Sequence, residues 1–154
     1  MKSIILVHSY HHNNTKKVAD TMGVVLNAKV KQVVGLDPEC VNGYGLIGLG
    51  AGIDSAKHYK ELLDFAKSMP ENQSGAKCFI FSTSAIQGDE KVYKDHTALR
   101  DVLLAKGYTV TSEFSCKGYN TNSILKFFGG MNKDHPTKDD LNRASAFAKE
   151  LAYA

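Results

Sequence analysis

Apolar runs and amphipathic segments alternate along almost the whole chain, and this alternation is what most constrains its fold. The apolar runs are short and either β-branched or alternating, and they predict strands at 3–8, 29–34, 44–50, 77–83 and 108–115. The segments between them carry apolar residues at helical spacing and predict helices at 16–27, 56–68, 92–106 and 138–152. Strands that alternate with helices predict a parallel sheet with helices on both of its faces.

The number of these segments favours one doubly wound α/β domain over residues 1–154. Five parallel strands fit the doubly wound order 2-1-3-4-5, in which the strand order reverses between the first and third strands. Ligands bind at that switch point, beyond the carboxyl ends of the strands. We therefore expect a site built from the loops that follow the strands, at 9–15, 51–55, 84–89 and 116–136.

Composition, charge and cysteine content narrow the function classes. The net charge of +3 is small and the basic residues are scattered, which argues against nucleic-acid binding. No apolar run is long enough for membrane insertion, and the N-terminus lacks the pattern of a signal peptide. The cysteines Cys40, Cys78 and Cys116 are widely spaced, so we expect reduced thiols, with Cys78 buried in a strand, in a cytoplasmic protein.

The segment Ser9–Thr15 is a short polar loop between the first strand and the first helix. Its hydroxyl, amide and imidazole groups, together with the backbone N–H groups at the start of the helix, are well suited to hold a phosphate. The loop has no lysine and lacks the glycine spacing of both the Walker A and the Rossmann motifs. Neutral donors of this kind favour a buried phosphate monoester, which points away from ATP and NAD and toward flavin mononucleotide (FMN).

Two parts of the sequence resemble the flavodoxin family. The loop Ser9–Thr15, with the sequence SYHHNNT, is similar to the SxHHGNT phosphate loop of a subgroup of flavodoxin-like proteins. The segments 117–120 and 129–141 resemble the C-terminal region of that subgroup. The resemblance spans nearly the whole chain and implies a flavodoxin-like sandwich that binds FMN non-covalently.

The resemblance also implies a set of cofactor-binding residues. Those expected around the FMN phosphate are Ser9, His11, His12, Asn13, Asn14 and Thr15. Those expected to flank the ribityl chain and the isoalloxazine ring are Gly50, Ala51, Gly52, Ile53, Asp54, Thr83, Ser84, Ala85, Ile86 and Gly88. Asn13 stands where the family has glycine, and asparagine is the non-glycine residue that best tolerates a left-handed backbone. The acidic residues nearest the expected ring are Asp54 and Asp89, which would tune its reduction potential.

The histidines have two interpretations. His8, His11 and His12 carry the commonest metal-binding group, but no cysteine or carboxylate accompanies them in the loop, so we expect no metal site. We expect His8, at the end of a strand, to be packed and hydrogen-bonded.

The small and hydroxyl-bearing residues at the strand ends also have two interpretations. Gly50 and Gly52 either relieve crowding in a strand or let a cofactor ring lie against the backbone, and their place at the switch point favours the ring. The hydroxyls of Ser82, Thr83 and Ser84 are unusual at a buried strand end unless something polar docks there.

Two departures from the flavodoxin pattern bear on function. Neither 51–55 nor 84–89 contains an aromatic residue to cover the ring, and the chain is mildly basic whereas flavodoxins are usually acidic. We prefer FMN-based electron transfer to a redox partner protein. The alternative is an FMN-dependent NAD(P)H:quinone-type oxidoreductase that reduces a small-molecule electron acceptor. The third interpretation is a flavin-free binding module with the same fold.

Overall fold

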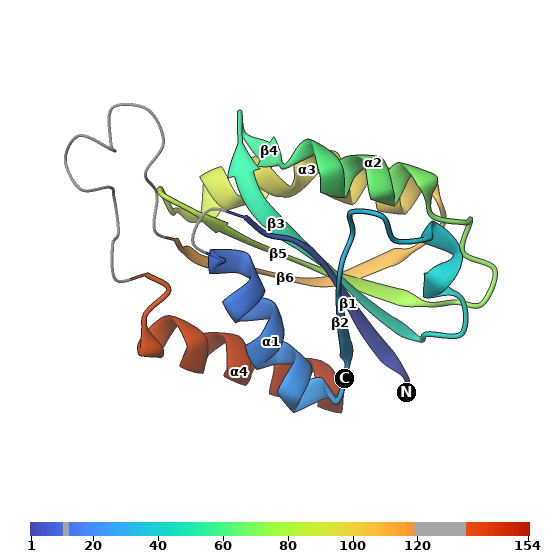
Figure 1. The fold of residues 1–154 in the computed structure, drawn as a ribbon, viewed down its shortest axis with the longest axis horizontal. Coiled ribbons are helices and arrows are strands. Elements are labelled where there is room, and N and C mark those ends of the chain that lie inside the picture. Colours follow the sequence, from blue (N-terminus) through green and yellow to red (C-terminus); the bar gives the residue numbers. More distant parts are fainter. Residues whose placement is uncertain (11–12, 119–134) are drawn as a thin grey trace.

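A computed structural model of the chain describes residues 1–10, 13–118 and 135–154. Its parallel sheet has the strand order β2-β1-β3-β5-β6, which confirms the predicted order of the five parallel strands (Figure 1). These strands are β1 (Ser3–His8), β2 (Lys29–Gln32), β3 (Leu46–Asp54), β5 (Lys77–Ser84) and β6 (Thr109–Lys117). A two-residue strand, β4 (Lys57–His58), pairs antiparallel with the end of β3.

Helices cover both faces of this sheet. Figure 1 shows α2 (Lys60–Ser68) and α3 (Asp89–Ala105) over one face, and α1 (Asn14–Leu26) and α4 (Lys138–Tyr153) over the other. A short 3-10 helix, η1 (Pro38–Val41), lies between β2 and β3 in the sequence. No helix in the described part of the chain is long and apolar enough to cross a membrane.

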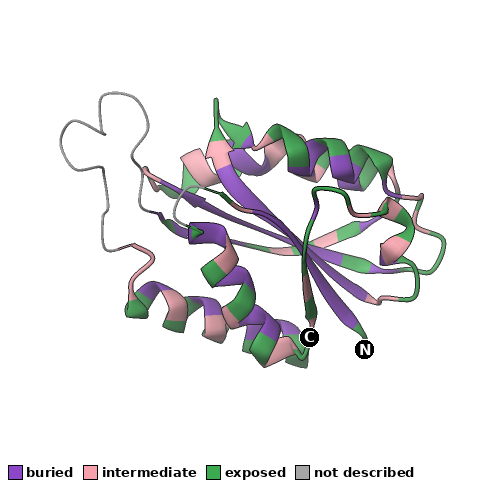
Figure 2. Cartoon of the chain, in the orientation of Figure 1, coloured by how far each residue is buried: buried purple, intermediate pink, exposed green. Residues whose placement is uncertain are grey.

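Each face of the sheet has its own hydrophobic core. Leu6, Leu49 and Ile80 pack under α2 and α3, whereas Phe79 and Phe81 pack under α1 and α4. In Figure 2 the central strands are buried along almost their whole length. This is the pattern of a parallel sheet that helices cover on both sides, and it leaves the strand ends as the place for a site.

The observed helices differ from the predicted ones mainly where they begin. α1 begins at Asn14 rather than at residue 16, so the end of the predicted polar loop forms the first turn of the helix. α2 begins at Lys60 rather than at residue 56, because the preceding residues turn back as β4. α3 begins at Asp89 and ends before Gly107, whose φ of 86° stops the helix as predicted.

α4 begins with the predicted N-cap residue, Thr137. Its hydroxyl accepts a hydrogen bond from Asp140 N, and the Asp140 carboxylate accepts one from Thr137 N, which completes a capping box. Burial raises the pKa of Asp140, but hydrogen bonds from Thr137, His135 and Arg143 outweigh burial and lower this pKa to about 2. The carboxylate therefore stays charged at the positive end of the helix dipole, where it is stabilising.

The cysteines are free thiols, as expected. Cys78 and Cys116 are buried, and burial raises the pKa of each to about 12. Both thiols are therefore protonated and unreactive at neutral pH.

β3 runs on to Asp54, four residues beyond the predicted strand end, so the segment 51–55 is not the loop that the sequence predicted. Asp54 pairs with Lys57, and Ser55 and Ala56 form the turn between them. Both turn residues have positive φ, 53° and 60°, as a two-residue type I′ hairpin requires.

Burial of His58 explains why the chain turns back at this point. The imidazole is fully buried against α3, and its Nε2 lies 3.0 Å from the carbonyl oxygen of Phe81 on β5. His58 and Phe81 are 23 residues apart in the sequence, so a local sequence pattern could not predict the hairpin.

Replacing Ala56 with glycine is expected to stabilise the protein by about 0.5–1 kcal/mol, because a left-handed backbone strains alanine but not glycine. The change would be measured as a higher urea midpoint. The matched control is Ala98→Gly inside α3, which should destabilise the protein by about 1 kcal/mol. A lower midpoint for Ala56→Gly would contradict the turn geometry.

Candidate functional site

The carboxyl ends of three adjacent strands bring the predicted site segments together. His8 on β1 lies opposite Ala51 on β3, and Gly52 on β3 lies opposite Thr83 on β5. The segments that begin at Ser9, at the end of β3 and at the end of β5 are therefore neighbours in space. The predicted residues His11 and His12 lie outside the described residues.

The polar loop leads into the N-terminus of α1. Ser9 Oγ accepts a hydrogen bond from Lys16 N at 3.1 Å, which holds the loop against the first turn of α1. Asn13 has a φ of 54°, which confirms that asparagine adopts the left-handed backbone at the position where the family has glycine. Its side chain makes no capping hydrogen bond, and the first turn of α1 contains no acidic residue. The positive end of this helix dipole is therefore suited to a phosphate.

A buried pair of hydroxyls joins the first turn of α1 to β5. Thr15 Oγ1 lies 2.9 Å from Thr83 Oγ1, and both residues are almost fully buried. One hydroxyl hydrogen makes this bond, so the hydrogen of the other hydroxyl is left for a further acceptor. The pair both fixes the helix N-terminus beside β5 and offers a neutral donor there.

The other hydroxyls at the end of β5 have partners within the protein. Ser82 Oγ lies 2.7 Å from His96 Nε2, and Ser84 Oγ donates to the carbonyl oxygen of Ile86 at 2.8 Å. Internal partners therefore account for the hydroxyls of Ser82 and Ser84, so these two need no docked polar ligand. The cofactor-binding roles of Thr83 and Ser84 stay predictions.

Packing gives a reason for the glycines of β3. A Cβ at Gly50 would lie 2.2 Å from the ring of Phe81, and a Cβ at Gly52 would lie 2.7 Å from the ring of Tyr59. Aromatic rings thus fill the space where side chains at these positions would lie. This supports the crowding interpretation, and a cofactor ring against this backbone stays a prediction.

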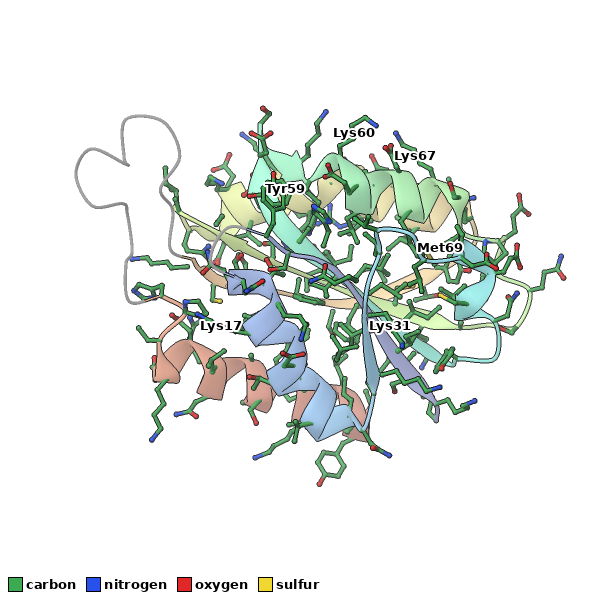
Figure 3. All side chains as sticks on the ribbon, in the orientation of Figure 1. Lys17, Lys31, Tyr59, Lys60, Lys67 and Met69 are labelled. Atoms are coloured by element: carbon green, nitrogen blue, oxygen red, sulfur yellow. The ribbon has the colours of Figure 1, made fainter. Side chains whose placement is uncertain are left out.

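A stacked pair of tyrosines lies at this edge of the sheet. Tyr59, at the beginning of α2 in Figure 3, stacks on Tyr10 with ring centroids 5.0 Å apart and an angle of 29° between the planes. Burial, followed by the neighbouring Tyr10, raises the pKa of Tyr59 to about 12, so its hydroxyl stays protonated. The sequence did not predict this pair, because aromatic cover for the ring was expected only from the segments 51–55 and 84–89. Tyr10 inside the polar loop was the available signal, whereas Tyr59 reaches the site only because the hairpin folds back.

His8 is packed beside these rings. Its ring meets Tyr10 and Tyr59 edge-on, with centroid distances of 5.2 and 5.9 Å. Neither ring nitrogen has a hydrogen-bond partner in the described part of the chain, and Nε2 lies 3.4 Å from Glu61 Oε2. The predicted packing is confirmed, whereas the predicted hydrogen bond is not found among the described residues.

The remaining predicted residues lie on two projections around the strand ends. Ile53 and Asp54 are on the hairpin, where Asp54 is exposed. Ala85 and Ile86 are in the loop after β5, and Ile86 is 56% exposed. Gly88 ends this loop with a φ of 136°, a backbone that favours glycine, and α3 follows.

These donors fit a phosphate-bearing planar cofactor. The helix N-terminus and the neutral hydroxyls suit a phosphate, and aromatic side chains at Tyr10 and Tyr59 lie beside them. Within residues 1–10, 13–118 and 135–154, no three His, Cys, Asp or Glu side chains come together in a way that could hold a metal ion.

Known proteins are similar to this chain in sequence and in fold. A family model described as a flavodoxin domain matches residues 5–151. An uncharacterized protein of Methanocaldococcus jannaschii is 41% identical over 151 residues, which cover 98% of each chain.

Solved structures show the same fold at low sequence identity. A flavodoxin of Streptococcus pneumoniae is 18% identical with a TM-score of 0.71, and flavodoxin 2 of Bacillus cereus is 18% identical with a TM-score of 0.69. Each match covers 99% of both chains. Rubredoxin oxygen:oxidoreductase of Desulfovibrio gigas is 15% identical with a TM-score of 0.70, and the match covers 99% of this chain and 35% of that one. Because the family model matches nearly its whole length, the chain belongs to the flavodoxin domain family.

Proposed function

We propose that this protein binds FMN at the carboxyl ends of β1, β3 and β5 and acts in electron transfer. The observation that carries the proposal is the N-terminus of α1, which has no acidic residue in its first turn and is joined to β5 by the Thr15–Thr83 hydroxyl pair. Ser9, Asn14 and Thr15 would hold the phosphate with the backbone of the first turn. His11 and His12 belong to the same proposal. FMN, when bound, supplies the electron-accepting and electron-donating chemistry.

The residues of this chain would bind and shield the flavin. The Tyr10–Tyr59 pair, the hairpin and the 84–88 loop are the groups available to flank the ring and to exclude water. The aromatic pair supports the carrier over the reductase. The absence of aromatic residues from 51–55 and 84–89 was one of the two sequence features that favoured a flavin ring exposed to a substrate. The mild positive charge is the other, and it still favours the reductase. A redox partner protein is therefore the proposed partner, a small-molecule acceptor is the alternative, and the cytoplasm is the proposed location.

The purified protein is expected to bind about one FMN per chain, and FMN should bind at least about a hundredfold more tightly than riboflavin. The reason is that two or more hydrogen bonds to a charged phosphate, each worth about 1.5–3 kcal/mol, are absent with riboflavin. Fluorescence titration of the apoprotein with each flavin measures both affinities. Equal affinities would contradict the phosphate site, and binding of neither flavin would favour the flavin-free module.

Carrier and reductase differ in how the bound flavin takes up electrons. Anaerobic reductive titration of the carrier is expected to resolve two separate one-electron steps. Direct two-electron bleaching, with rapid oxidation of NADH or NADPH in the presence of a quinone, would favour the reductase instead.

A further inference from the structure

Beside the candidate site, Arg100 of α3 and Glu113 of β6 form a partly exposed ion pair. Arg100 donates to both carboxylate oxygens of Glu113, from Nε at 2.8 Å and from Nη2 at 2.7 Å. His96 is fully buried, and its Nδ1 lies 2.8 Å from Glu113 Oε1. The other ring nitrogen, Nε2, lies 2.7 Å from Ser82 Oγ.

The protonation states of these groups fix the direction of their hydrogen bonds. Burial raises the pKa of Glu113, but hydrogen bonds from Arg100 and His96 outweigh burial and lower it, so the carboxylate only accepts. Burial lowers the pKa of His96, so its ring is neutral at pH 7 and carries one hydrogen. That hydrogen must be on Nδ1, facing the carboxylate, and Nε2 must accept from the Ser82 hydroxyl.

The chain of hydrogen bonds continues from Ser82 to Gln87. Ser82 Oγ also donates to Ser115 Oγ at 3.0 Å, so its single hydroxyl hydrogen is shared between His96 Nε2 and Ser115 Oγ. Ser115 Oγ then accepts from Gln87 Nε2 at 3.2 Å. Ser82 is 1% exposed, so this Ser–His–Glu arrangement cannot present a nucleophile to a substrate.

Three acceptors converge on the amide nitrogen of Gln87. Besides Ser115 Oγ, they are Ser84 Oγ at 2.8 Å and the carbonyl oxygen of Cys116 at 3.1 Å. Ser84 donates its own hydroxyl hydrogen to Ile86 O, so its Oγ can only accept in the contact with Gln87 Nε2. The amide of Gln87 therefore connects the 84–88 loop to β6 at two points.

We propose that Gln87 is a positioning residue that holds the 84–88 loop in the shape that flanks the cofactor, and that the chain Ser115–Ser82–His96–Glu113 orients its amide. The link to the cofactor rests on the proposed function, whereas the anchoring of the loop does not. Gln87 touches no reacting group in this proposal, and it acts through the loop.

Two variants with a matched control separate this role from a general loss of stability. Gln87→Met keeps the length of the side chain but removes the donor. Gln87→Glu places carboxylate oxygens opposite the carbonyl of Cys116, which repels. Gln87, Glu113 and Ser115 line an open pocket of about 420 Å³, so water can reach the polar groups that the variants leave and the fold should survive. Gln73→Met, at an exposed position near the opposite ends of the strands, is the control.

Amide hydrogen exchange of the flavin-free protein tests the anchoring directly. Exchange at 84–88 is expected to be at least about tenfold faster in Gln87→Met and faster again in Gln87→Glu, while the core strands and the control stay within about twofold of the wild type. Unchanged exchange at 84–88 in both variants would overturn the proposal. A uniform increase over all strands would also overturn it, since it would mean general destabilisation.

Two further readouts test the direction of the chain and its link to the flavin. Nitrogen-15 shifts of His96 should show the hydrogen on Nδ1, and a hydrogen on Nε2 would overturn the proposed direction. With FMN bound, both Gln87 variants should change the visible circular dichroism of the flavin but keep the preference for FMN over riboflavin, and an unchanged spectrum would overturn the link to the cofactor. If the wild type binds no FMN, the proposed function fails, whereas the exchange experiment still decides the role of Gln87.

Discussion

Replacing Asn14 and Thr15 together with alanine is expected to weaken FMN binding by at least about tenfold, because hydrogen bonds to a charged phosphate contribute about 1.5–3 kcal/mol each. Riboflavin, which has no phosphate, should bind the variant as it binds the wild type. The ratio of the two affinities therefore isolates the phosphate contribution. Fluorescence titration gives the affinities, and far-UV circular dichroism checks that the variant is folded.

Two single variants serve as controls for this prediction. Thr21→Ala makes the same chemical change in α1 at a partly exposed position, where the hydroxyl donates to Lys17 O, and should leave FMN affinity unchanged. Thr83→Val removes the partner of Thr15 and should lower stability by about 1 kcal/mol. An unchanged FMN affinity in the double variant would mean that the phosphate binds elsewhere.

The protein is expected to lose about 2 kcal/mol of stability between pH 7.5 and pH 5.0 through His58 alone. Burial, followed by the neighbouring His96, lowers the pKa of His58 to about 3, whereas an unfolded histidine has a pKa of about 6.5. Below pH 6.5 the unfolded chain therefore binds a proton that the folded protein does not, so stability falls as the pH falls. Burial lowers the pKa of His96 as well, and its contribution has the same sign.

This loss would be measured by urea unfolding at the two pH values. His58→Gln should be less stable than the wild type at pH 7.5, but it should lose about 2 kcal/mol less on going to pH 5.0. The folded-state pKa values of Glu113 and Asp140 are lowered, so the stability that these carboxylates contribute is lost mainly below this window. Parallel pH dependence in the wild type and the variant would show that His58 does not set the acid sensitivity.

The order of the strands could be predicted from the sequence because it depends on local patterns. Short apolar runs separated by amphipathic helices allow few arrangements, and the right-handed crossover rule reduces them further. Local chemistry likewise predicted the Thr137 cap, the end of α3 at Gly107 and the left-handed Asn13. Each of these depends on the backbone preferences of one or two residues.

The end of β3 could not be predicted in this way. The sequence indicates a loop at 51–55, whereas the structure has a hairpin that exists because His58 is buried against α3 and bonded to Phe81 O. That hairpin brings Tyr59 back onto Tyr10, so that an aromatic pair lies at a place where the loop segments themselves have no aromatic residue. Both the hairpin and the tyrosine pair therefore depend on contacts between residues that are distant in the sequence.

The sequence by itself thus determined the order of the five parallel strands and of the long helices that cover them, because this order follows from periodicity, and the chemistry of the contiguous loop 9–15 predicts a phosphate site there. Tertiary structure alone decided which polar side chains are already hydrogen-bonded within the protein. The partners of Ser82 and Gln87 lie on other elements, and the ring of Phe81 fills the space beside Gly50. A hydrogen bond or a packing contact depends on distance in space, which no single segment of sequence contains.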